Sequence, residues 1–281
     1  MLALPRYPPR PTIKRLPERK RMTAIVGLHC TDGVLLLADT EETISQETKS
    51  ECDKISVLGL PHGRMLLGGA GTTHFIEYAE QMIERDFLKS ARTWPEILVD
   101  INALYSRINR DTQGFYKGFA KELVPAGIEL LTAVNSSGRT VLYRWQNDSV
   151  IETNPRRHES VGCGVYQTHA LLGDINLRLG AEGMLFYGVR IMKQAKRGIV
   201  GVGGKTEAII LHHNGEIGIF STGVTSQIEE LIAEIDAFTH RSFLSLIADV
   251  YSKDEEFENL LSQVADRIRG YRKRYKENRH R

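Results

Sequence analysis

The chain has 281 residues, of which 41% are hydrophobic and 26% are charged, and its formal net charge is +2. This length suits one large domain or two small ones, and the balance of residues is ordinary for a globular protein. The near-neutral charge gives no indication of a nucleic-acid partner. No apolar run approaches the roughly 20 residues that cross a bilayer, so we expect no membrane partner either.

Residues 1–22 are rich in proline and basic residues and lack an apolar segment typical of a secretory signal. Their composition favours disorder. Three interpretations stay open: a propeptide, a basic tail, or sequence upstream of a true start at Met22.

The first folded segment reads as a hairpin of strands 23–30 and 34–39, joined by an Asp-Gly turn. Strands at 54–60 and 64–69 follow, with a Gly/Pro turn between them. A glycine cluster at 68–71 then precedes a helix with apolar residues at helical spacing.

The rest of the chain alternates in the same way. We expect the following further elements: a helix at 94–110, strands at 128–135, 140–145 and 149–153, helices at 165–179 and 182–197, strands at 206–212 and 215–221, and helix from 224 onward. Runs of strands separated by pairs of helices favour antiparallel sheets covered by helices over a parallel sheet.

The three cysteines, Cys30, Cys52 and Cys163, are odd in number and far apart. This spacing favours neither a disulfide framework nor a zinc site, so we expect a reducing cytoplasm and no metal or other cofactor.

Short motifs give the chain a resemblance to a known family. They are Thr23-Ala24-Ile25-Val26-Gly27, the run Asp32-Gly33-Val34-Leu35-Leu36-Leu37-Ala38-Asp39, Lys54-Ile55, Gly68-Gly69-Ala70-Gly71, Gly162-Cys163-Gly164 and Gly203-Gly204. In order and spacing they resemble proteasome β-type subunits and their bacterial relatives, the N-terminal-nucleophile (Ntn) hydrolases.

The resemblance covers residues 23–222 and implies an α+β fold there: a four-layer αββα sandwich of two antiparallel sheets, as an Ntn-hydrolase domain. Outside it we expect a leader or mis-assigned start at 1–22 and, from the helical periodicity, a C-terminal helical extension at 223–281. The resemblance also implies assembly into homo-oligomeric or stacked rings.

Catalytic roles carry over to four residues that match the motifs. Thr23 resembles the nucleophile, Lys54 the lysine beside it, Asp39 the acid that pairs with that lysine, and Gly68 the glycine whose N–H stabilises the oxyanion. Thr43 and Gly69 resemble substrate-binding positions, and Cys163 stands where a serine usually supports the terminal amine.

The chemistry would depend on removal of Met22, because Thr23 then carries a hydroxyl nucleophile and a free amine base on one residue. The pKa of an α-amine is roughly 7.7–8.0, which suits a general base near neutral pH. A neighbouring Lys54 cation would lower that pKa. Losing an oxyanion donor such as the Gly68 N–H costs about 2.7–4 kcal/mol.

The resemblance predicts a cytoplasmic threonine-type endopeptidase that acts on peptides or unfolded proteins inside a ring, with an ATP-dependent unfoldase as a candidate partner. Ile199 and Val202 stand where the family places an aspartate and a serine that support the amine. These departures favour one alternative, a non-catalytic subunit of a proteasome-like ring. An Ntn amidase or transpeptidase that acts on one specific substrate is a third interpretation that stays open.

Overall fold

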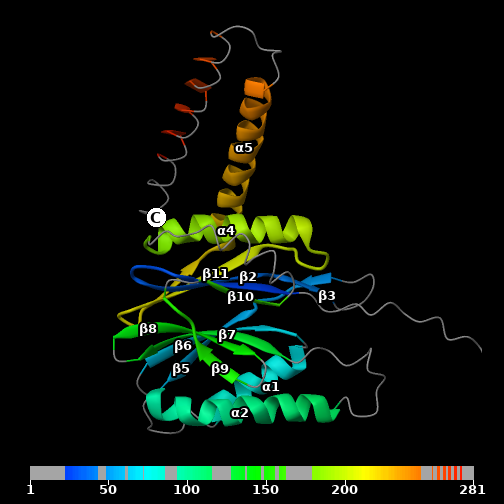
Figure 1. Cartoon of the computed structure of the whole chain (residues 1–281), viewed down its shortest axis with the longest axis vertical. Coiled ribbons are helices and arrows are strands. Elements are labelled where there is room, and N and C mark those ends of the chain that lie inside the picture. The colour runs from blue at the N-terminus through cyan, green and yellow to red at the C-terminus, as the bar shows by residue number, and fades with distance from the viewer. Residues whose placement is uncertain are drawn as a thin grey trace, which may run out of the picture.

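The structure is a computed structural model (Figure 1). It describes residues 23–43, 49–60, 63–71, 73–85, 94–115, 128–136, 138–146, 149–155, 158–162 and 179–247, with isolated positions between 255 and 273.

Two five-stranded antiparallel sheets dominate the described residues. The first sheet has the order β10-β1-β2-β11-β12 and comprises β1 (Ala24–His29), β2 (Gly33–Asp39), β10 (Glu159–Gly162), β11 (Thr206–His212) and β12 (Ile217–Phe220). The second sheet has the order β5-β6-β7-β8-β9 and comprises β5 (Ile55–Leu60), β6 (Gly63–Ala70), β7 (Glu129–Ser136), β8 (Arg139–Gln146) and β9 (Ser149–Glu152).

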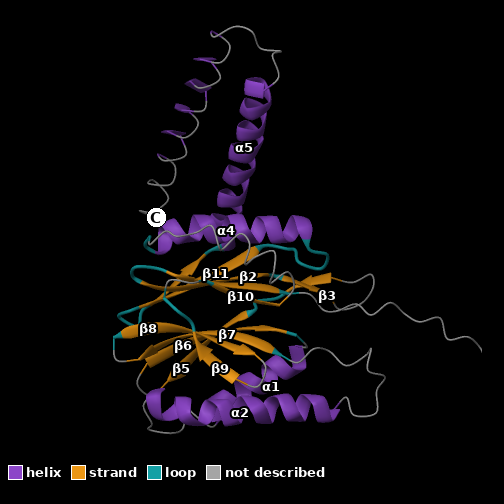
Figure 2. Cartoon of the chain, viewed as in Figure 1, coloured by secondary structure: helices purple, strands orange, loops and turns teal. Residues whose placement is uncertain are grey.

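Helices lie on the outer faces of the two sheets, as Figure 2 shows with the helices in purple and the strands in orange. Helix α1 (Thr73–Ile83) and helix α2 (Trp94–Phe115) lie beside the second sheet, and α4 (Ala181–Gly198) lies across the first. Helix α5 (Thr222–Ile247) starts against α4 and β11 and then rises away from the body.

The expected αββα sandwich of two sheets is wrong as a description of this chain. A third, two-stranded sheet forms from β3 (Glu41–Thr43) and β4 (Lys49–Glu51), which the sequence gave no apolar alternation to predict. In addition, α5 does not lie flat on a sheet but projects from it (Figure 1). The described residues are a mixed α and β structure with three antiparallel sheets.

The expected domain limits stay a prediction. The limit at 222 coincides with the first residue of α5, whose base packs on α4 and β11. Most of the expected helix 165–179 lies outside the described residues.

Apolar side chains of the strands alternate between two layers of the core, as the period of two in a strand requires. Val26, Leu35 and Leu37 belong to the cluster beneath α4. Ile25 and Leu36 belong to a cluster between the two sheets, which also contains residues of β6, β7 and β8. Strands β1 and β2 are therefore buried on both faces, which explains their nearly continuous apolar sequence.

Polar contacts tie the two sheets together at one end of the inter-sheet layer. The side-chain amide of Asn135, at the end of β7, donates to the carbonyl oxygens of His212 (3.2 Å) and His213 (2.8 Å). The hydroxyl of Thr140 also donates to His212 O, at 2.8 Å. These bonds fix how the β7–β8 hairpin lies against the β11–β12 turn.

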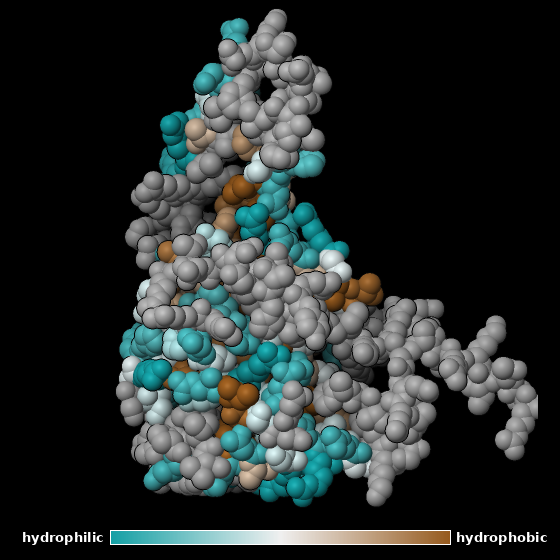
Figure 3. All heavy atoms as spheres, viewed as in Figure 1, coloured by the Kyte–Doolittle hydropathy of each residue, from teal (hydrophilic) through white to brown (hydrophobic). Residues whose placement is uncertain are grey.

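No helix in the described part of the chain combines the length and the apolar character that a bilayer crossing needs. On the face shown in Figure 3, hydrophobic residues reach the surface in separate patches among polar ones. Val200 and Ile219 are among the most exposed large apolar residues, at 83% and 71%.

We expect Leu36→Ala to lower the free energy of unfolding by about 2–5 kcal/mol, because it opens a cavity in the inter-sheet layer. Leu36 has no exposed surface. Denaturant unfolding followed by circular dichroism measures this change. The matched control is Ile219→Ala, at the exposed position of β12, which should change stability by no more than about 0.5 kcal/mol. Equal losses in both variants would contradict the core described above.

Candidate active site

Several strand ends meet at the end of the molecule opposite the Asn135 contacts. Thr23 immediately precedes β1, Asp39 ends β2, and Lys54 immediately precedes β5. Because β1 and β2 are antiparallel neighbours, the start of one lies beside the end of the other, with Ile25 opposite Ala38. Residues that are 15 to 31 positions apart in the sequence are thereby brought together.

Asp39 is the buried centre of this site. Its side chain has no exposed surface, and one carboxylate oxygen, Oδ1, accepts a hydrogen bond from the backbone N–H of Ala24 at 2.9 Å. The other, Oδ2, accepts from Lys54 Nζ at 3.0 Å and from the backbone N–H of Gly203 at 3.3 Å. The carboxylate therefore holds three separate segments in place, including the residue that follows Thr23.

The ammonium of Lys54 uses all three of its donors. It contacts Asp39 Oδ2 at 3.0 Å, the backbone oxygen of Glu41 at 2.7 Å, and the hydroxyl oxygen of Thr23 at 3.4 Å. The Lys54 side chain is only 9% exposed, so these protein contacts replace water. A lysine that donates in this way can stabilise negative charge on the Thr23 oxygen but has no lone pair available to act as a base.

Gly162 shapes the site beside Thr23. It lies opposite Ala24 in the β1–β10 pair and has a φ of +92°, in the region that favours glycine. A Cβ there would lie 2.0 Å from the backbone oxygen of Thr23. The Gly162 N–H donates to Glu129 Oε2 at 3.0 Å. The sequence motif contained Gly162, but nothing in it indicated this close backbone approach.

A pocket of about 200 Å³ opens beside Thr23 and Lys54. Five carboxylate residues line it: Glu41, Glu42, Asp53, Glu77 and Glu80. The Ser56 hydroxyl donates to Glu80 Oε1, and burial raises the pKa of Glu80 above its ordinary value, with Glu77 and Glu84 adding repulsion. Its described lining is therefore strongly acidic, and the Lys54 ammonium, which also lines it, is already paired with Asp39.

The other expected site residues are placed less directly. Gly69 and Gly71 line the pocket, whereas the Cβ position of Gly68 faces the Ile25 side chain. Thr43 ends β3, paired in register with Lys49, while its neighbours Glu41 and Glu42 line the pocket. Cys163 lies outside the described residues. The roles assigned to these residues stay predictions.

Ile199 and Val202 are core residues. They are 9% and 4% exposed and belong to the apolar cluster beneath α4. The polar contact from this loop to the site is instead a backbone group, the N–H of Gly203 on Asp39. This loop therefore contributes apolar packing and one backbone donor, that of Gly203, to the surroundings of Asp39.

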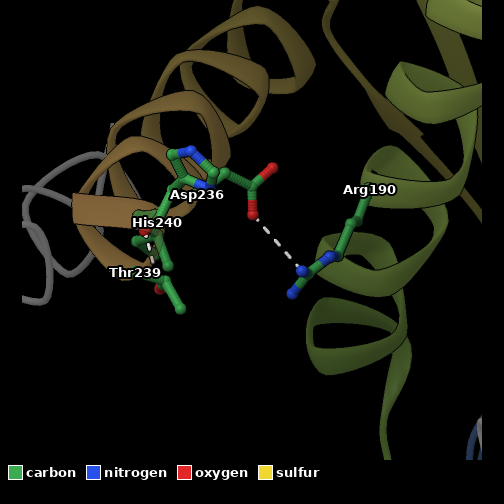
Figure 4. Close-up of a pocket in the computed structure, with 5 residues that line it drawn as sticks. Arg190, Asp236, Thr239 and His240 are labelled. Atoms are coloured by element: carbon green, nitrogen blue, oxygen red, sulfur yellow. Dashed lines mark hydrogen bonds and ion pairs between the residues drawn. The ribbon is translucent and has the colours of Figure 1, made fainter. Parts of the chain in front are cut away.

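A second hollow, of about 450 Å³, lies between α4 and α5 (Figure 4). Arg190 of α4 pairs there with Asp236 of α5 at 3.2 Å, and Thr239 and His240 complete its wall. This hollow contains none of the residues that surround Thr23. Within the described residues, no three His, Cys, Asp or Glu side chains are grouped as metal ligands.

Comparisons with known proteins give a fold but no sequence family. No protein-family model matches the chain, and no curated protein matches it. Solved structures of Anbu do match: a Gly-1 mutant from Hyphomicrobium sp. strain MC1 (12% identity, TM-score 0.62) and Anbu, described as an ancestral beta-subunit, from Yersinia bercovieri (11% identity, TM-score 0.62). Both alignments cover 77% of this chain and 96% of the other.

A third match is the helical assembly of the Anbu complex from Pseudomonas aeruginosa, with 14% identity and a TM-score of 0.60. It covers 78% of this chain and 96% of the Anbu chain. At these identities the comparison shows a shared fold alone. Placing the chain among proteasome β-type subunits from its short motifs was therefore wrong: no sequence-level match supports that membership, and what the comparisons support is an Anbu-like fold.

We expect Asp39→Ala to lower the free energy of unfolding by about 3–5 kcal/mol, because it leaves the Lys54 ammonium buried without its counter-ion. The matched control is Asp236→Ala, which breaks the exposed pair with Arg190 and should cost at most about 1 kcal/mol. Urea unfolding of both variants measures the difference. A loss for Asp39→Ala no greater than that of the control would mean that the buried pair does not hold the site together.

Proposed function

We propose that this protein is a threonine-type peptidase whose nucleophile is Thr23, exposed as the N-terminal residue once the preceding residues are removed. The observation that carries the proposal is the contact of Lys54 Nζ with both Thr23 Oγ1 (3.4 Å) and Asp39 Oδ2 (3.0 Å). A hydroxyl beside a buried, oriented cation is where an oxyanion of the nucleophile is best stabilised.

In this proposal the free α-amine of Thr23 takes the hydroxyl proton as the oxygen attacks a peptide carbonyl. The tetrahedral intermediate collapses to an ester on Thr23, and the leaving amine takes the proton back from the α-ammonium. Water, deprotonated by the same amine, then hydrolyses the ester. Lys54 stays protonated throughout, and backbone N–H groups of the Gly68–Gly71 segment are the candidates for binding the carbonyl oxygen.

The proposal includes homo-oligomeric assembly in a ring or a helical array. Its support is the Anbu-like fold, since one Anbu structure is itself a helical assembly. Enclosing the Thr23 site inside such an assembly would restrict the substrate to peptides or unfolded chains. The proposal therefore includes an ATP-dependent unfoldase as a partner and a cytoplasmic location.

One observation favours a second candidate, a non-catalytic subunit of such an assembly. Ile199 and Val202 are packed in the apolar core, so their side chains give the Thr23 amine no hydrogen bonds. Retention of the buried Asp39–Lys54 pair supports the enzyme instead, because a buried ion pair is weak as a source of stability.

Covalent labelling tests whether Thr23 is an activated nucleophile. Protein expressed from Met22 is treated with a β-lactone, which acylates N-terminal threonine, or with an epoxyketone, which alkylates it. We expect one adduct by intact mass, because the amine and hydroxyl of Thr23 are then both free. Thr23→Ala should give none, and neither should the chain that keeps residues 1–22, whose Thr23 nitrogen is an amide. An unlabelled protein whose N-terminus is shown to be Thr23 would favour the non-catalytic subunit.

The negative charge of the pocket indicates which kind of substrate side chain it would bind in this proposal. A substrate side chain entering the space beside Thr23 meets Asp53, Glu77 and Glu80 in addition to Glu41 and Glu42. Burial and the carboxylates of Glu77 and Glu84 already raise the pKa of Glu80, so a bound cation would relieve this repulsion. A lysine or arginine side chain on the substrate fits that environment.

We therefore expect peptides with lysine or arginine before the cleaved bond to have a kcat/KM at least about tenfold above leucine peptides, since a hydrogen bond to a charged group contributes about 1.5–3 kcal/mol. Glu80→Gln should reduce this preference, whereas Glu230→Gln on exposed α5 should not. Fluorogenic peptides that differ only in that residue measure the ratio. A preference for leucine or for acidic residues would exclude the acidic pocket as the binding site for this side chain.

A further inference from the structure

Glu207 is a carboxylate in an apolar layer. The side chains of β11 alternate, with Ala208 and Ile210 in the cluster beneath α4 and Ile209 and Leu211 in the cluster between the sheets. By the period of two, Glu207 belongs to the inter-sheet side. It lies opposite Ala38, the neighbour of Asp39, in the β2–β11 pair.

The carboxylate reaches across to the other sheet. One oxygen, Oε2, accepts the backbone N–H of Lys54 at 2.8 Å and that of Ile55 at 3.2 Å. Strand β5 is at the edge of the second sheet, where N–H groups on the outer side have no neighbouring strand. Glu207 supplies the missing acceptor from the first sheet.

These two bonds fix the backbone from which the Lys54 side chain extends. A lysine side chain is a flexible four-carbon stem, so the position of its ammonium depends on how firmly its backbone is held. The ammonium must meet Thr23 Oγ1 and Asp39 Oδ2, which belong to the first sheet, from a residue that leads into the second. A small shift of β5 against β11 would separate Nζ from both oxygens.

We propose that Glu207 is a positioning residue for Lys54: its carboxylate oxygen anchors the Lys54–Ile55 backbone to β11 and so sets the contact of the Lys54 ammonium with Thr23 and Asp39. The inference rests on the proposed function for its catalytic consequence, and on the two hydrogen bonds alone for the anchor.

The ionised form of Glu207 carries a free-energy cost of burial that a neutral hydrogen-bond acceptor of the same length would avoid. Burial raises the pKa of Glu207 above 4.5 and Asp53 adds repulsion, while the N–H groups of Lys54 and Ile55 and the Lys54 charge oppose the rise. A carboxyl group whose pKa is raised in the folded state stabilises the fold at pH values below its unfolded-state pKa. This contribution to the free energy of unfolding is lost as the pH rises through the folded-state pKa. Near neutral pH, Glu207→Gln should therefore be neutral or stabilising.

The experiment compares Glu207→Gln with Glu207→Met. Glutamine keeps an oxygen acceptor of the same reach, and methionine keeps the length without a strong acceptor. We expect Glu207→Gln to retain the wild-type rate of Thr23 labelling within about threefold, and Glu207→Met to lose between about tenfold and a hundredfold, the range for a misplaced catalytic group. Glu152→Met, which removes an exposed carboxylate paired with Arg139, is the control and should leave the rate unchanged.

Two further measurements keep the test decisive. Glu207→Asp keeps the charge but shortens the side chain, so it should behave like methionine; it replaces methionine if that variant does not fold. Amide hydrogen exchange in the full chain should be at least about tenfold faster at Lys54 and Ile55 in Glu207→Met than in Glu207→Gln, with similar melting temperatures.

The proposal that Glu207 anchors Lys54 would be overturned by equal labelling rates for the glutamine and methionine variants. Equal amide hydrogen exchange rates at Lys54 and Ile55 in these two variants would overturn it as well. A wild-type protein that exposes Thr23 but is not labelled would overturn the proposed function instead. In that case the exchange comparison alone decides whether Glu207 holds Lys54.

Discussion

The site depends on the burial of one carboxylate, that of Asp39. A charge with no exposed surface is tolerated only when donors surround it, and Asp39 has three: the Lys54 ammonium and the N–H groups of Ala24 and Gly203. Each donor comes from a different segment of the chain. Satisfying this carboxylate therefore determines where the residue after Thr23 lies, where Lys54 points and how the loop before β11 returns to the site.

The two sheets need such polar contacts because the layer between them is apolar. Hydrophobic contacts such as those of Ile25 and Leu36 favour burial but are non-directional, so they tolerate a sliding of one sheet on the other. Hydrogen bonds are directional, so they resist this sliding of one sheet on the other. Asn135 fixes one end of the layer and Glu207 the other, and the Thr23 site lies at the Glu207 end, where placement within a fraction of an ångström has chemical consequences.

Local patterns predicted the local parts of this structure. The Asp-Gly turn predicted the β1–β2 hairpin. Asp39 became a candidate only through the resemblance, as the acid that pairs with the lysine, because an acid at the end of an apolar strand is by itself an ordinary turn residue. Glu207 gave no signal, because one acid in an alternating strand reads as a solvent-facing residue, and its role depends on Lys54, 153 positions away. The short β3–β4 pair had no apolar pattern to reveal it. Glycine pairs and apolar strings recur across unrelated chains, so they suggested a family that no sequence comparison supports, while the fold itself is shared with Anbu at 11–14% identity.

Lys54 separates two sets of charges that would otherwise be one. On its inner side its ammonium is committed to Asp39, to the Glu41 carbonyl and to the Thr23 hydroxyl. On its outer side the pocket acids remain, and because an ammonium has three donors it has none left for them. The pocket therefore stays acidic although a lysine lines it. The Lys54 ammonium is fixed beside the Thr23 hydroxyl, and among the described lining residues it leaves Asp53, Glu77 and Glu80 without a cation.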